Sequence, residues 1–427
     1  MKSIKEKNGI TLIALAVTII VILILAAVTI SFVLGEDGII NKAKEAANAM
    51  NNAVANDQAS LNDLFNELND VINGIGGSGD SNTETPDPEP ELPKLEDTTG
   101  MQEETVQVED EYGNKVTVPK GFEVVEEEGT TVPEGIVIQD KDKNQFVWIP
   151  VGRVYKDNTG ENFADIQLGR YTFNTSNGTP TPVQLAYTDE EPEKYKQEIK
   201  LRPSGRNYDF IEYATRENPD GIASSGKDGL NAIAENLGTF VDSVRNNGGY
   251  YLGRYEASYG SGDSIDKYKP LSKVSTSTTF STATVGSLWN NVTQIDAAKI
   301  SRNMYSESDN VGVESDLVNS YAWDTAIVFI QAMGNGNENY ANKPSVNSSL
   351  ANTGTTGDEV CNIHDMASNC LEWSTEYSTY TSYSSAYPCV SRGGSCSSSS
   401  YYTAFRNGSF ATAKNTSSSF RPLLYVK

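Results

Sequence analysis

The side chains that could carry out chemistry lie close together near the C-terminal end of the sequence. The chain contains one histidine, His364, and four cysteines, Cys361, Cys370, Cys389 and Cys396. A single histidine excludes a three-histidine iron site and zinc sites that need two imidazoles. A Ser-His-Asp triad would have to use His364 itself. The clustered cysteines are compatible with two disulfides, in any of three connectivities, and equally with buried free thiols.

The same region is rich in serine and tyrosine, from residue 374 to residue 402. Tyrosine offers a large rigid contact area at a small entropy cost, and serine offers adaptable hydrogen bonding, so this composition is typical of binding loops. The alternative is a soluble serine-rich surface that binds nothing. The residues we expect to contact a ligand are Tyr377, Tyr380, Tyr383, Tyr387, Ser398, Ser400, Tyr401, Tyr402, Thr403, Phe405 and Asn407.

Three motifs enclose this tract. Residues 361–373 read CNIHDMASNCLEW, residues 391–396 read SRGGSC, and residues 419–424 read SFRPLL. Together they resemble the "YDMAGNVWEW … RGGSW … GFR" signature of the formylglycine-generating-enzyme/sulfatase-modifying-factor family. The segments 146–151 (FVWIPV) and 250–256 (YYLGRYE) resemble earlier landmarks of that family. The resemblance implies an α+β domain with a C-type-lectin-like fold over residues 107–427.

The family's oxidase chemistry uses a pair of thiols that bind copper, in a segment that follows the RGGS strand. Here the matching segment, residues 397–407, contains no cysteine, and Cys396 occupies the position of the family's tryptophan. Without a thiolate pair a soft metal has no ligands. We therefore expect no copper, no haem and no catalytic residues. His364 occupies a position where the family has Tyr or Phe, which predicts a buried ring.

The resemblance implies a structural Ca²⁺ site, because the family's turn supplies oxygen ligands from Asn and Glu side chains. Asn369 and Glu372 match those positions, and hard oxygen ligands suit Ca²⁺. The alternative is that Asn369 caps a turn and Glu372 pairs with an arginine. Arg392 and Arg421 match family positions that are usually structural, as does Arg406, and we expect them in buried pairs.

The same C-terminal location on this fold carries the variable residues of diversity-generating-retroelement target proteins, which are ligand binders. The resemblance therefore favours a cell-surface binder of a protein or glycan over two alternatives. One alternative is a divergent metal-dependent modifying enzyme, and the other is a minor pilin-like assembly component without a ligand.

The N-terminal segments indicate how such a domain is attached to a membrane. Residues 1–9 form a short basic leader, and residues 10–34 form an almost wholly apolar run, long enough for a membrane-spanning helix. The leading lysines place the N-terminus in the cytoplasm and the C-terminal domain outside the cell. Gly9 followed by Ile10 resembles a type IV prepilin processing site, which makes a pilus-type assembly machinery a possible partner. Ala14 departs from the glutamate that those pilins carry, so a plain membrane anchor is the alternative.

Between the apolar run and the domain, residues 35–73 predict a helical stalk and residues 74–106 an acidic Gly/Pro-rich linker. The chain carries a net charge of −24, which argues against nucleic acid as a partner, because binding of phosphate backbones needs a basic face. Residues 152–249 are polar, and we expect them to form insertions with one helix near residues 231–245.

Overall fold

A computed structural model describes residues 92–214, 232–306, 309–382 and 385–427. Over these residues the chain is mostly sheet with few helices, which confirms the α+β class. The predicted leader, apolar helix and stalk, and the first part of the linker, lie outside the described residues. Within the described ranges, no helix combines the length and the apolar character that crossing a membrane requires.

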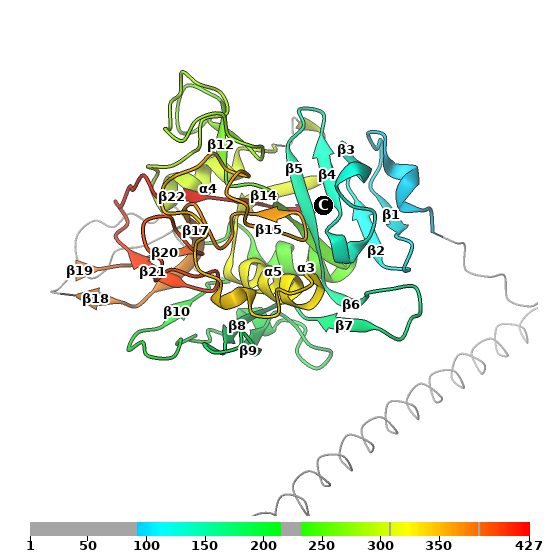
Figure 1. Cartoon of the computed structure of the whole chain (residues 1–427), viewed down its shortest axis with the longest axis horizontal. Helices are drawn as coiled ribbons and strands as arrows, with labels where there is room; N and C mark the ends of the chain where they lie inside the picture. Colours follow the sequence, from blue (N-terminus) through cyan, green and yellow to red (C-terminus); the bar gives the residue numbers. More distant parts are fainter. Residues whose placement is uncertain (1–91, 215–231, 307–308, 383–384) are drawn as a thin grey trace, which may run out of the picture. The chain divides into compact units, whose positions relative to one another are not determined.

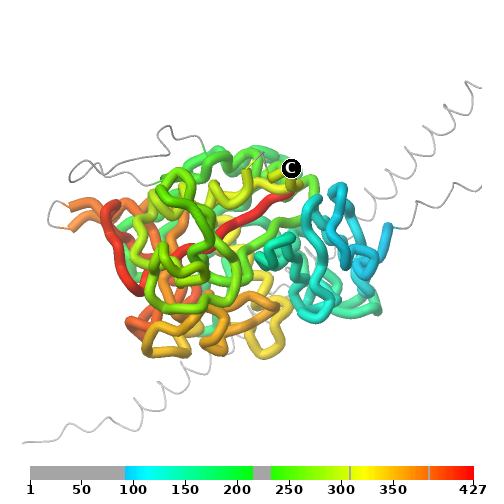
Figure 2. The backbone as a smooth tube through the Cα atoms, turned by 90° about the horizontal axis from the view of Figure 1, so that it is seen from above, coloured from blue at the N-terminus to red at the C-terminus, as the bar shows by residue number. Residues whose placement is uncertain are grey.

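A six-stranded antiparallel sheet contains residues of the family-like segments 146–151 and 250–256 in neighbouring strands (Figure 1). Its core is built on aromatic side chains, among them Trp148, Tyr250 and Tyr251, which are completely buried. The strands, in spatial order, are β14 (Val313–Leu317), β23 (Pro422–Val426), β11 (Gly249–Gly253), β5 (Gln145–Pro150), β4 (Val137–Asp140) and β3 (Phe122–Val124). The strand nearest the C-terminus, β23, therefore runs through the interior of the sheet, as the red trace in Figure 2 shows.

A five-stranded sheet contains part of each of the three motifs. Its members are β10 (Phe210–Ile211), β17 (Leu371–Ser378), β20 (Cys389–Arg392), β21 (Arg406–Ser409) and β22 (Ser418–Phe420). The strand β17 pairs with β22 in parallel, whereas its pairings with β10 and β20 are antiparallel. The register of β17 against β20 shifts between Ser374 and Tyr377. Such a bulge re-aims side chains, and here Thr375 and Glu376 are both buried.

The remaining strands form two-stranded hairpins around these sheets. They are β1 (Val106–Glu109) with β2 (Lys115–Val118), β6 (Gly152–Tyr155) with β7 (Phe163–Ile166), β8 (Gly169–Phe173) with β9 (Pro180–Leu185), β12 (Ser258–Ser261) with β13 (Lys269–Leu271), β15 (Glu359–Val360) with β16 (Ile363–His364), and β18 (Thr381–Ser382) with β19 (Ser385–Ala386). Two of these hairpins, β6–β7 and β8–β9, lie within residues 152–249, for which the sequence predicts insertions. The hairpin β12–β13 lies in a stretch for which the sequence indicates no element.

The α-helices of the described residues are α3 (Leu237–Asn247), α4 (Gln294–Arg302) and α5 (Ser320–Met333). Each begins at a residue whose side chain accepts a hydrogen bond from a first-turn backbone N–H, namely Asn236, Thr293 and Asn319, as expected of N-caps. Helix α5 contacts β5 of one sheet and β17 of the other. Its side chains Ala322, Trp323, Ala326 and Phe329 are completely buried, as the helical spacing predicts.

Ordered packing begins before Gln107, in residues that the sequence assigned to the linker. The 3₁₀-helix η1 (Leu95–Thr98) contacts β3, and Leu95 is buried. Contacts divide the chain into one unit up to Glu89 and another from Pro90 to Lys427. The other 3₁₀-helices of the described residues are η2 (Glu126–Glu128), η3 (Val132–Glu134), η4 (Lys194–Lys196) and η7 (Tyr340–Asn342).

Candidate functional site

Four aromatic rings cross one end of the five-stranded sheet, and we call them the aromatic stack: Tyr208, Tyr380, Tyr387 and Phe410. Each ring stands at a strand end, beside β10, β17, β20 and β21 respectively. Successive ring centroids are 4.5, 4.9 and 4.2 Å apart, and the ring planes are tilted by 34–36°. Because antiparallel strands bring alternate ends together, residues from four segments meet here. Two of the four, Tyr380 and Tyr387, were predicted from the sequence.

A second aromatic group lies just before β21. The ring of Phe405 lies 4.9 Å from the ring of Tyr401 and 5.4 Å from that of Tyr402. The guanidinium of Arg206 joins this group to the aromatic stack, since its Cζ lies 5.1 Å from the Phe405 ring and 5.6 Å from the Tyr208 ring. Arginine over aromatic faces is a favourable cation–π arrangement. The predicted ligand-contacting residues before and after the SRGGSC motif are thus joined by Arg206, which the sequence analysis did not include.

Beside Arg206 is a cavity of about 460 Å³, which we call the Arg206 pocket. Hairpin β8–β9, the turn at residues 202–206 and residues 402–406 enclose it. Its lining residues are Thr172, Phe173, Asn174, Thr175, Thr181, Arg202, Pro203, Ser204, Arg206, Tyr402, Ala404, Phe405 and Arg406. The volume falls in the range of small-molecule sites. Three arginines line this pocket, and no carboxylate does.

A buried ionic cluster lies beneath the pocket and fixes the strands that form it. Arg392 contacts Asp324 of α5 at 2.6 Å and Glu376 of β17 at 3.3 Å. Arg406 pairs with the same two carboxylates, and Arg170 contacts Glu376 at 3.0 Å. These five side chains are at most 2% exposed. Arg406 belongs both to this cluster and to the lining of the pocket, so the cluster holds one wall of the pocket in place.

Two glutamates at this cluster have shifted pKa values in opposite directions. Burial acts to raise the pKa of Glu376, but the charges of Arg406, Arg392 and Arg170 lower it to about 2. Glu212 is also completely buried, and this burial, together with the charge of Glu376, raises its pKa to about 7. The hydroxyl of Thr375 and the backbone N–H of Ser320 donate hydrogen bonds to Glu212 at 2.7 and 2.8 Å.

The other predicted ligand-contacting residues differ in accessibility. Tyr377 is half-buried with its ring 5.7 Å from that of Tyr213, and Ser398 and Asn407 are also half-buried. Ser400 is exposed. Thr403 is completely buried, and its backbone carbonyl accepts a hydrogen bond from the Trp323 indole, so it supports the loop from below. Tyr383 lies outside the described residues.

The predicted calcium ligands both have protein partners. Asn369 donates to Glu256 at 2.5 Å, and its side-chain oxygen accepts from the backbone of Ala351 at 2.9 Å. Glu372 forms a bidentate pair with Arg421, at 2.7 and 3.0 Å. Among the described residues no group of three or more His, Cys, Asp or Glu side chains is placed to hold a metal. Calcium at Asn369 and Glu372 stays a prediction.

The cysteines are buried or half-buried, and the histidine is buried. All four thiols are free, and Cys370 and Cys389 are completely buried. Burial raises the pKa of the Cys361 thiol to about 12, which disfavours the nucleophilic thiolate. The His364 ring stacks on Tyr255 at 4.7 Å and its Nε2 lies 3.2 Å from Glu359. The neighbouring His364 side chain is the main cause that lowers the pKa of Glu359 to about 2.

Sequence reasoning missed Arg206, Tyr208 and Phe410. The signal was present in the segment RPSGRNY at residues 202–208, where an arginine and a tyrosine follow a turn. Gly205 has a φ of +77° there, a backbone conformation that favours glycine. The segment lies far along the chain from the tract that it completes, so its relevance appears only when the fold brings β10 beside β17.

Comparison of the chain with family models, with curated proteins and with solved structures found no match in any of the three.

Proposed function

We propose that this is a surface-displayed ligand-binding protein, with a non-catalytic C-type-lectin-like domain whose binding surface comprises the aromatic stack, Tyr401, Tyr402, Phe405 and the Arg206 pocket. The observation that carries this proposal is the convergence of half-exposed aromatic rings and an arginine beside a cavity. Aromatic and arginine side chains dominate the energetics of interfaces. The ligand is a protein or a glycan.

The C-type-lectin-like fold is supported by contacts among the three family-like motifs. Arg421 of the last motif pairs with Glu372 of the first. The backbone N–H of Gly394 donates to the Met366 carbonyl at 3.2 Å, and a Cβ at position 394 would lie 1.7 Å from the Ala367 carbonyl oxygen. The glycine pair in SRGGSC is therefore required by the close approach of the DMAS turn.

The binding proposal is tested by arrays of glycans and cell-surface proteins probed with the full chain in detergent. We expect Tyr401→Ala/Tyr402→Ala to lose binding, because truncating an interface anchor commonly costs more than about 2 kcal/mol. Tyr155→Ala, in the β6–β7 hairpin, is the matched control and keeps binding. Unchanged binding by a folded double variant would place the site elsewhere on the molecule.

We further propose that residues 10–34 anchor the protein in a membrane after removal of the leader, with the C-terminal domain outside the cell. Support comes from the uninterrupted apolar run and the lysines that precede it. Mass spectrometry of protein from the native membrane is expected to find Ile10 as the first residue. Finding Met1 instead would support the plain anchor.

A further inference from the structure

Arg206 differs from the buried arginines in that no carboxylate among the described residues pairs with it. One of its Nη atoms donates to the Tyr208 hydroxyl at 2.8 Å, and its guanidinium lies against the faces of two aromatic rings. A guanidinium has five N–H donors. Most of these donors are therefore available at the edge of a cavity.

Charge in the pocket favours an anion. The other two lining arginines have partners outside the lining, Arg202 with Asp209 at 2.6 Å and Arg406 within the buried ionic cluster. Arg206 therefore makes the pocket locally positive in a chain of net charge −24, and a positive potential attracts anionic ligands.

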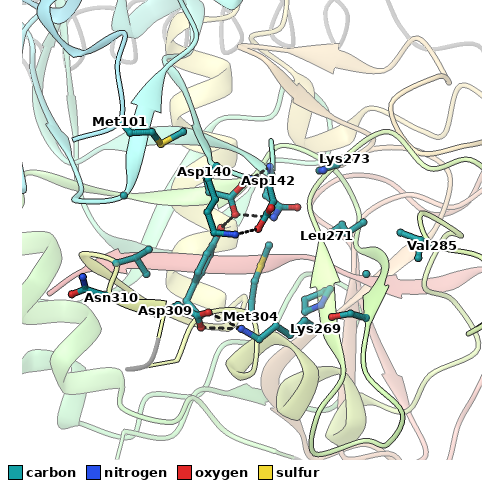
Figure 3. Close-up of a pocket in the computed structure, with 18 residues that line it drawn as sticks. Met101, Asp140, Asp142, Lys269, Leu271, Lys273, Val285, Met304, Asp309 and Asn310 are labelled. Carbon is teal, nitrogen blue, oxygen red and sulfur yellow. Dashed lines mark hydrogen bonds and ion pairs between the residues drawn. The ribbon is translucent and has the colours of Figure 1, made fainter. Parts of the chain in front are cut away.

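A larger cavity, of about 560 Å³, shows the contrast (Figure 3). Its lining contains three lysines and three aspartates, so it carries no net charge. Two of the lysines are already paired, Lys269 with Asp309 at 2.8 Å and Lys141 with Asp142 at 2.6 Å. That cavity offers an anion no comparable attraction, and we draw nothing from it.

The remaining lining of the Arg206 pocket is rich in hydroxyl groups. The side chains of Thr172, Thr175 and Thr181 make no hydrogen bond to other described residues and lie on hairpin β8–β9. The rings of Phe173, Tyr402 and Phe405 also line the pocket. Hydroxyl groups beside aromatic surface suit a ligand with several hydroxyl groups and one apolar face.

We propose that the Arg206 pocket binds an acidic sugar residue, with its carboxylate on Arg206 and its hydroxyl groups on the threonines. Guanidinium and carboxylate form bidentate hydrogen bonds of matched geometry. An acidic peptide would also supply carboxylates, but its aspartate and glutamate side chains carry no hydroxyl groups, so an acidic sugar matches the hydroxyl-rich lining better. This inference deepens the proposed function and rests on it, since the pocket belongs to the proposed binding surface.

The test is isothermal titration of the full chain in detergent with four probes. The acidic sugars are methyl β-D-glucuronide and the methyl glycoside of N-acetylneuraminic acid, the neutral control is methyl β-D-glucoside, and the acidic peptide is hexaglutamate. We expect at least one acidic sugar to bind and the neutral sugar and peptide to bind at least tenfold more weakly. Higher ionic strength should weaken the binding of the acidic sugar, because salt screens the attraction between its carboxylate and Arg206.

Variants assign the binding to the pocket. Arg206→Gln is expected to lower the affinity for the acidic sugar at least tenfold and to leave the melting temperature unchanged. Arg206→Lys is expected to lower this affinity less, because lysine keeps the positive charge but cannot form the bidentate hydrogen bonds of a guanidinium. Arg153→Gln is the matched control, since Arg153 also lies over an aromatic ring, 4.1 Å from Phe163, in another hairpin. If Arg206→Gln does not fold, Thr175→Val replaces it, because Thr175 is exposed.

Several outcomes would overturn the inference. The first is that Arg206→Gln, or Thr175→Val where that variant replaces it, binds the acidic sugar as tightly as the wild type does. The others are that the wild type binds the neutral sugar as tightly as the acidic sugar, that it prefers hexaglutamate, or that it binds neither acidic sugar. If any of these occurs while array binding still depends on Tyr401 and Tyr402, only the acidic-sugar inference fails. If array binding does not depend on those tyrosines, the proposed function fails as well.

Discussion

Arginine side chains in this domain occur in two environments with different energetic consequences. Arg421 is completely buried and donates to Glu372, and also to the backbone carbonyls of Gly253 and His364 at 2.7 Å each. Arg153, by contrast, pairs with Asp165 on the surface with about half of each side chain exposed. Desolvated pairs depend strongly on both partners, whereas solvated pairs contribute little.

We therefore predict that Arg421→Met destabilises the protein by about 3–5 kcal/mol, because Glu372 is left as an uncompensated buried charge. Adding Glu372→Gln should recover part of this loss. Arg153→Gln should change the stability by less than about 1 kcal/mol. Urea denaturation of the three variants measures the differences, and a small effect of Arg421→Met would mean that the pair is solvated.

Glu212 gives a prediction for pH dependence. Its pKa is about 7 in the folded protein and 4.5 in its ordinary state, so the folded state keeps a proton that the unfolded state releases. The contribution of Glu212 to the free energy of unfolding is therefore fully present below about pH 4.5. It is lost as the pH rises to 7, and the loss is up to about 3 kcal/mol. Glu212→Gln should flatten the melting-temperature profile between pH 5 and 8 and be more stable than the wild type at pH 8.

The control lies at acidic pH, where Glu376 acts in the opposite direction. Its folded pKa of about 2 means that its stabilisation is present above about pH 4.5 and is lost as pH falls towards 2. Both proteins should lose stability together in that range. A Glu212→Gln profile parallel to the wild type from pH 5 to 8 would contradict the assignment.

At the scale of elements, the aromatic stack closes one end of the five-stranded sheet and supports hairpin β18–β19. Tyr387 lies within it, with ring neighbours at 4.9 and 4.2 Å. We predict that Tyr387→Ala destabilises the protein by about 1–3 kcal/mol, since each aromatic pair contributes about 0.5–1.5 kcal/mol beyond area burial. Amide exchange should accelerate in β18, β19 and the adjoining end of β17.

Tyr387→Phe is the matched variant, because it keeps the ring and removes only the hydroxyl. It should behave like the wild type in denaturation and in amide exchange. If it is as damaging as Tyr387→Ala, the hydroxyl rather than ring stacking stabilises this end of the sheet.

Elements with a regular apolar pattern could be predicted from the sequence, and others could not. β2 to β5, β11 and α5 follow from short apolar runs and from helical spacing. Hairpin β8–β9 was missed because β9 reads PTPVQL, without clear alternation. What holds that hairpin is long-range: the backbone N–H groups of Gly169 and Tyr171 donate to Thr325 and Asp324 of α5.

The candidate site was predictable to the same extent. The positions of Tyr401, Tyr402 and Phe405 came from their place after the SRGGSC motif, which is local information. Arg206 could not be found in this way, because its contacts with Phe405 depend on the pairing of sheet strands that are distant in sequence. The burial of Thr403 could not be predicted either, because composition does not show which side chains of a loop point inward.

At the scale of the whole molecule, the domain is expected to fold without residues 1–89. The four tryptophans, Trp148, Trp289, Trp323 and Trp373, are at most 2% exposed in this domain, so their fluorescence reports its unfolding. We predict a single cooperative transition for a fragment of residues 90–427. Aggregation or a gradual transition would show that the N-terminal residues take part in folding.

A fragment of residues 107–427 provides the comparison. It lacks Leu95, which is 4% exposed against the core, and the backbone hydrogen bond from Glu109 to Pro93, of 3.0 Å. Loss of a buried leucine costs about 2–5 kcal/mol, so the shorter fragment should be less stable by a similar amount. Equal stability of the two fragments would place the folding boundary at Gln107.

The interior position of β23 has a consequence for biosynthesis. Residues 422–426 lie between β11 and β14, which are made earlier, so the six-stranded sheet cannot close until these residues have left the ribosome. A nascent chain therefore keeps the facing edges of β11 and β14 unpaired until β23 has been made. Unpaired strand edges are templates for pairing with other chains, so we expect products terminated before residue 422 to aggregate.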